Sequence, residues 1–185
     1  MRKDRFANAA LRGRYALRIN AIEGDRALFD AYVERFESAQ VPEDRNRYLG
    51  AIGEFRDPVL REAALRYTLE GPLRPNEIFA IPRRAVRTPV GADQVFEWMT
   101  RNFDAISNRI TPEMVAFLPY MASGCSAERL EAAVAFFGDP DHQIGGAERN
   151  MAKVADQITD CVNLREREGA SVAAYLNRLA RASAQ

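Results

Sequence analysis

Few of the side chains that usually carry out catalysis or bind metals occur in this 185-residue sequence, which contains one histidine and two cysteines. The histidine, His142, lies in the turn-forming sequence Asp-Pro-Asp-His-Gln. A catalytic zinc site of the His-Glu-Xaa-Xaa-His type needs two imidazoles one helical turn apart. We therefore expect His142 to be a solvated loop residue, and we expect no catalytic residue, no metal ligand and no cofactor site in this chain.

The two cysteines, Cys125 and Cys161, are also weak candidates for catalysis. The sequence Ser-Gly-Cys-Ser at 123–126 resembles a nucleophile site, but a cysteine nucleophile needs a base, and small residues are common where two helices are joined. Two cysteines cannot form a disulfide framework, and an unpaired buried thiol is the more common state in a reducing compartment. The prediction is that both thiols are buried and unpaired and that the protein is cytoplasmic.

The basic cluster Arg83, Arg84 and Arg87 has the position that best suits ligand binding. It lies in a proline-interrupted segment ahead of the most hydrophobic predicted helix, and guanidinium groups bind carboxylates through paired hydrogen bonds. These arginines are our candidates for contacting a peptide substrate. The alternative is that they are solvated or form ion pairs between helices, as most surface charges do.

The numbers of charged and apolar residues limit the classes of partner that this protein can bind. The 26 basic and 26 acidic residues cancel, which argues against nucleic-acid binding and against anionic lipid surfaces, because both require an excess of positive charge. The longest run of small apolar residues, 132–137, is far shorter than the roughly 20 residues of a membrane span. We predict no nucleic-acid partner and no membrane partner. The length is consistent with one domain, 1–185.

The element expected to organise the chain is a central helix over 92–109. Its large apolar residues recur every three or four positions, which places them on one face of an α-helix. This segment also contains the single tryptophan, Trp98. We predict that Trp98 and Phe103 are buried here and that Phe136 and Phe137 join the same core.

Helix-start signals precede and follow this segment, at Asp25, Pro42, Asp57-Pro58, Thr111-Pro112 and Ser126. Two further helices are expected at the end, one closing at Gly169. No stretch alternates as a half-buried strand does, so the predicted class is all-α. Helix pairs recurring at about 33–35 residues favour a curved α-solenoid of antiparallel helix pairs, similar to HEAT or armadillo repeats, with about 8–10 helices.

Several blocks resemble one known family. The sequence Trp-Met-Thr-Arg-Asn-Phe-Asp at 98–104 resembles the block of tryptophan, asparagine, aromatic residue and aspartate in the C-terminal helical domain of aminopeptidase N-like zinc aminopeptidases. The segment 122–125, followed by Ala-Phe-Phe at 135–137, is similar to the serine-containing turn and paired phenylalanines of that domain.

The resemblance implies that this chain is the C-terminal substrate-enclosing domain of a larger enzyme that removes N-terminal residues from peptides. It also implies that the zinc and the catalytic residues of the parent enzyme belong to a preceding domain. The expected partners are then the preceding domains of the same polypeptide and a peptide substrate. The alternative is a free-standing α-solenoid that binds a protein or peptide on its concave face.

Overall fold

The computed structural model describes residue 13 and residues 15–183, and every regular element in that part of the chain is helical. The sequence also predicts a first helix over residues 4–22, of which residue 13 and residues 15–22 are helical, whereas residues 4–12 and 14 lie outside the described residues. The elements that follow are α2 (Arg26–Ser38), α3 (Pro42–Ile52), α4 (Pro58–Glu70), the 3₁₀-helix η1 (Pro75–Glu77), α5 (Pro82–Ala85), α6 (Pro89–Arg101), α7 (Phe103–Ser107), α8 (Pro112–Val115), the 3₁₀-helix η2 (Leu118–Ala122), α9 (Ala127–Gly138), the 3₁₀-helix η3 (Pro140–His142) and α10 (Ala147–Ser183).

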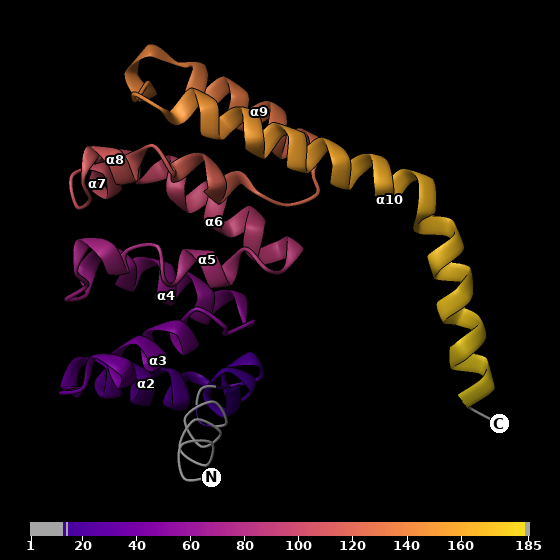
Figure 1. Cartoon of the computed structure of the whole chain (residues 1–185). Helices are drawn as coiled ribbons and strands as arrows, with labels where there is room; N and C mark the ends of the chain where they lie inside the picture. Colours follow the sequence, from indigo (N-terminus) through magenta and orange to yellow (C-terminus); the bar gives the residue numbers. More distant parts are fainter. Residues whose placement is uncertain (1–12, 14, 184–185) are drawn as a thin grey trace, which may run out of the picture.

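The helices stack in layers that follow the order of the chain, from α2 and α3 at one end to α9 and α10 at the other (Figure 1). The predicted all-α class is confirmed, and the layered order is consistent with the predicted solenoid. No helix within the described ranges combines the length and hydropathy needed to cross a membrane.

Three predicted helix starts are confirmed by side-chain caps. The carboxylate of Asp25 accepts a hydrogen bond from the amide of Leu28 at 2.9 Å. Asp57 accepts bonds from the amides at the start of α4, and Ser126 accepts one from the amide of Arg129 at 3.1 Å. Amides in the first turn of a helix have no partner within the helix, so these local signals fix where each helix begins.

The central helix is not continuous, so that part of the prediction is wrong. Helix α6 begins earlier, at Pro89, where Thr88 accepts a hydrogen bond from the amide of Gly91, and α7 follows after a break at Asn102. The Asn102 side chain donates to the carbonyl of Trp98 at 2.7 Å. A short amide side chain competes with the helix backbone in this way and satisfies a carbonyl at the end of α6.

Aromatic side chains pack α7 against α9. Trp98, Phe103 and Phe137 are buried, and Phe136 is half-buried at the edge of the same core. The ring of Phe103 meets those of Phe136 and Phe137 edge to face, with centroids 5.4 and 6.4 Å apart. These contacts join the middle of the stack to its last layer.

His142 is not the solvated loop residue that the sequence predicted. Its ring stacks on Phe136 with a centroid distance of 3.8 Å and an interplanar angle of 14°, and it meets Phe103 edge to face at 4.9 Å. Its Nδ1 lies 3.0 Å from the carbonyl oxygen of Phe136. The turn after α9 folds back on the aromatic core, which makes His142 a packing residue.

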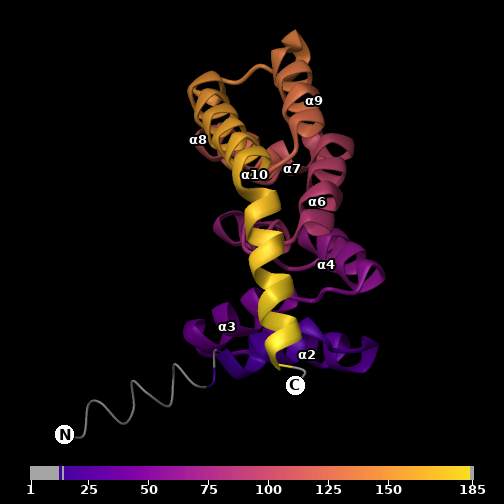
Figure 2. The ribbon, with the colours of Figure 1, turned by 90° about the vertical axis from the view of Figure 1, so that its right-hand side faces the viewer.

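The prediction that Gly169 ends a helix is also wrong, because α10, which is 37 residues long, continues through it. A glycine inside a helix costs only about 1 kcal/mol relative to alanine, so its presence does not enforce a break. Ile158 is fully buried, whereas the large apolar side chains from Leu164 to Leu179 are 48–56% exposed. In Figure 1 this last part of α10 runs clear of the stack, and Figure 2 shows its length face on.

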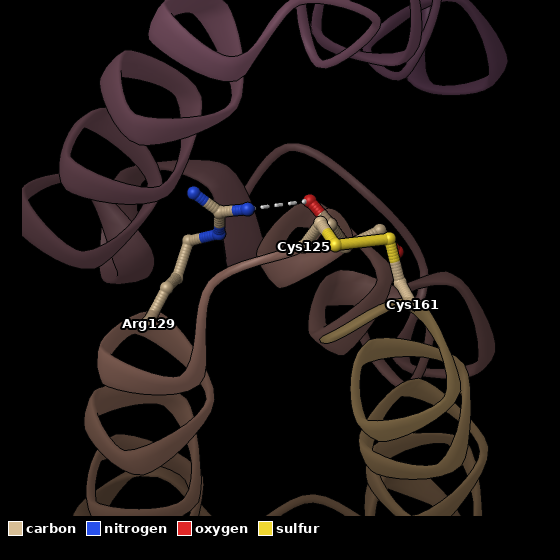
Figure 3. The surroundings of a disulfide bond; sticks show 4 residues. Cys125, Arg129 and Cys161 are labelled. Atoms are coloured by element: carbon tan, nitrogen blue, oxygen red, sulfur yellow. Dashed lines mark hydrogen bonds between the residues drawn. A yellow bond between two sulfur atoms is a disulfide. The ribbon is translucent and has the colours of Figure 1, made fainter. Parts of the chain in front are cut away.

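Cys125 and Cys161 form a disulfide, so the prediction of unpaired thiols is wrong (Figure 3). Their Cα atoms are 5.3 Å apart, within the usual range for such a bond. The buried Arg129 fixes the loop that carries Cys125, donating from Nε to the carbonyl of Ala122 at 3.0 Å. The bond attaches α10 to the η2–α9 connection close to the point where α10 leaves the stack.

Candidate functional site

The candidate site is a cavity of about 650 Å³ between α5 on one side and α8 and η2 on the other. We call it the apolar cavity, and its wall consists of Phe79, Pro82, Arg83, Val86, Met114, Phe117, Tyr120, Met121 and Ser123. Its volume lies within the range of about 300–1,000 Å³ that is typical of small-ligand sites.

Prolines shape this region by limiting its helices to a single turn. The Thr111-Pro112 signal predicts one helix that begins here and bends at Pro119, but the structure has two short helices instead, because α8 ends at Val115 and η2 begins at Leu118. The interruption leaves Phe117 51% exposed, and its ring stacks on that of Tyr120 with centroids 6.2 Å apart. A large aromatic side chain that is half exposed in a cavity wall is available to contact a ligand.

The structure divides the predicted arginine cluster between two places. Arg83 is exposed and lines the apolar cavity, and no carboxylate of the described residues lies within ion-pair distance of it. Arg84 and Arg87 instead lie 3.5 and 3.7 Å from a carboxylate oxygen of Glu54. Because side chains leave a short helix in different directions, arginines adjacent in sequence need not share a site.

The residues that the structure describes do not fit a zinc site. Residue 13 and residues 15–183 contain no group of three or more histidine, cysteine, aspartate or glutamate side chains that could hold a metal ion. The two cysteines are bonded to each other, and His142 packs on Phe136.

The wall of the apolar cavity is suited to binding. Met114 and Met121 are flexible and polarizable, so they adapt to apolar groups of different shapes. Arg83 supplies a positive charge at the edge of this surface, and a guanidinium binds a carboxylate with two parallel hydrogen bonds. An apolar surface beside one unpaired arginine matches a peptide that presents apolar side chains and a carboxylate.

The fold and the cavity define a layered, all-helical domain with an apolar cavity between α5 and the α8–η2 segment. A model of the family described as "ERAP1-like C-terminal domain" matches residues 7–160. The chain belongs to this family of ERAP1-like C-terminal domains. The matched range ends at Asp160, two residues after the last fully buried residue of α10, Ile158.

Two curated relatives are aminopeptidases of Saccharomyces cerevisiae. The "Alanine/arginine aminopeptidase" is 29% identical over 133 residues, which is 69% of this chain and 15% of the relative. "Aminopeptidase 2, mitochondrial" is 21% identical over 164 residues, which is 86% of this chain and 16% of the relative. The chain thus spans about one sixth of the length of each relative.

Proposed function

We propose that residues 1–185 form the C-terminal domain of a larger, zinc-dependent aminopeptidase and that this domain encloses the peptide substrate. Family membership and the names of both relatives support the parent activity. The zinc and the residues that cleave the peptide bond would belong to preceding domains of the same polypeptide. Those domains and the peptide are the proposed partners of this chain.

The observation that carries the proposal is the apolar cavity with Arg83 in its wall. A peptide held there by apolar contacts would have its far end fixed while its N-terminus is cleaved elsewhere. Fixing a substrate in a reactive position and excluding water both lower a reaction barrier without a catalytic group in this domain. This domain would therefore contribute to catalysis by positioning the substrate.

Arg84 and Arg87 were also predicted to contact substrate, and that stays a prediction. Glu54 already lies near both guanidinium groups and would compete with the carboxylate of a peptide. We therefore expect Arg83 to contribute more to peptide binding than the other two arginines.

The test is steady-state kinetics of the intact enzyme carrying Arg83→Ala, with a peptide and an aminoacyl anilide as substrates. A charge-assisted hydrogen bond contributes about 1.5–3 kcal/mol, so KM for the peptide should rise about tenfold or more, and KM for the anilide should change little. Arg101→Ala, an exposed arginine of α6 outside the apolar cavity, is the matched control. Equal effects on both substrates would show that Arg83 does not sense the far end of the peptide.

A cytoplasmic location remains a prediction. The disulfide between Cys125 and Cys161 argues for an oxidising compartment, because disulfides persist mainly there. Alkylation of free thiols in freshly lysed cells, followed by mass spectrometry, distinguishes free cysteines from the disulfide. Labelled cysteines would agree with the cytoplasmic prediction.

A further inference from the structure

A second cleft, of about 260 Å³, lies where residues 15–22, the α3–α4 connection and α5 meet. It shares no wall residue with the apolar cavity. We call it the arginine cleft, and its charged wall residues are Arg18, Glu54, Arg56, Arg61, Arg84 and Arg87. Five guanidinium groups and one carboxylate leave a large excess of positive charge among these residues.

One carboxylate oxygen of Glu54 takes part in three ion pairs. Arg18 donates to it from Nε at 2.7 Å, and guanidinium nitrogens of Arg84 and Arg87 lie 3.5 and 3.7 Å away. The Glu54 side chain is only 10% exposed, so water screens the charges poorly. The one negative charge of Glu54 cannot balance both Arg18 and Arg87, and a second anion in the cleft would relieve the repulsion between these cations.

Arg61 adds an independent observation. It is 4% exposed and donates hydrogen bonds to the side chain of Gln94 and to the carbonyl of Arg56, at 2.5 and 2.7 Å. No carboxylate within the described part of the chain is close enough to form an ion pair with it. Burial lowers the pKa of Arg61, and the charge of Asp57, which forms no ion pair with it, offsets only part of this effect, so the position of Arg61 in the wall favours an anion in the cleft.

We propose that the arginine cleft binds a small tetrahedral dianion of the phosphate class. The planar fork of arginine matches the spacing of phosphate oxygens, and two negative charges oppose the local excess of positive charge. The cleft is smaller than the roughly 300–1,000 Å³ typical of drug-sized ligands, which suits one oxyanion. Inorganic phosphate and the phosphate group of a small monoester share this chemistry. The proposal does not depend on the peptidase role.

The test is isothermal titration calorimetry of the whole chain with inorganic phosphate, at an ionic strength held constant with chloride. Phosphoserine is titrated in parallel. We expect saturable binding at one site. Binding of inorganic phosphate alone would identify a free oxyanion as the ligand, and tighter binding of phosphoserine would identify a phosphate monoester.

The double variant Arg56→Ala, Arg87→Ala removes two exposed arginines of the cleft and should weaken phosphate binding about tenfold or more. Arg87→Ala alone, at a side chain that is 52% exposed, gives the same test if the double variant does not fold. The matched control, Arg178→Ala with Arg181→Ala, removes two arginines from the exposed part of α10 and should leave binding unchanged. Absence of saturable binding, or equal weakening by the control pair, would overturn the proposal.

Discussion

Removing the disulfide should destabilise the last layer of the stack. The perturbation is the double substitution Cys125→Ser, Cys161→Ser, which deletes the bond and changes each side chain by one atom. The bond closes a loop between positions 36 residues apart. In the chain-entropy model, opening a loop of that length lowers the free energy of unfolding by about 4 kcal/mol at 25 °C, within the range of about 2–5 kcal/mol typical of native disulfides.

The assay is urea unfolding followed by far-UV circular dichroism. With a slope of about 2 kcal/mol per molar urea, a loss of about 4 kcal/mol lowers the midpoint by about 2 M. Dithiothreitol should move the wild-type midpoint to that of the double variant and should leave the variant unaffected. An unchanged midpoint in the variant, or an equal effect of dithiothreitol on both proteins, would refute the reasoning.

Three further predictions concern the interior. Trp98→Ala should lower the free energy of unfolding by about 3–5 kcal/mol, since it leaves a cavity in the core, and urea unfolding measures this loss. Asn102→Ala should cost about 1 kcal/mol in the same assay, because the Trp98 carbonyl loses its side-chain partner, and an unchanged midpoint would contradict that role. Burial raises the pKa of Glu77, but hydrogen bonds from Arg45 and the Arg74 amide outweigh it and hold the pKa below its ordinary value. The ionised Glu77 therefore stabilises the folded state fully when the pH is above the ordinary carboxyl pKa. This stabilisation is lost as the pH falls through the lowered pKa of Glu77 in the folded protein. Glu77→Gln should accordingly lose less stability than wild type between pH 5 and 3, as acid titration of thermal unfolding would show.

Helix positions were the most predictable part of the fold, because capping depends on neighbours in sequence. Asp25, Asp57 and Ser126 each bond to amides two or three residues ahead, so the sequence alone contains the whole interaction. The apolar spacing likewise predicted the all-α class.

Features that depend on distant residues could not be predicted. The histidine ring meets Phe103 of α7 only because η3 folds back on the aromatic core, and the disulfide forms only because α10 passes the loop that contains Cys125. Glycine and asparagine signals were ambiguous for a different reason. Gly169 costs too little to end α10, whereas Asn102 breaks the central helix with its own side-chain bond.

The candidate site was predicted only in part. Arg83 was named as a candidate, but its separation from Arg84 and Arg87 depends on the direction of each side chain around α5 and on the position of Glu54. Phe117 and Tyr120 were not named as site residues. The signal that could have found them is the proline on either side of Phe117, at 112 and 119, which limits the local helices and leaves aromatic rings exposed.

The central claim is that this chain positions peptide for a catalytic domain that it does not itself contain. The most direct measurement is hydrolysis of aminoacyl anilides by the isolated chain with added zinc, with the intact enzyme as the positive control. We expect turnover by the intact enzyme and none by the chain alone. Appreciable zinc-dependent turnover by the chain alone would contradict it.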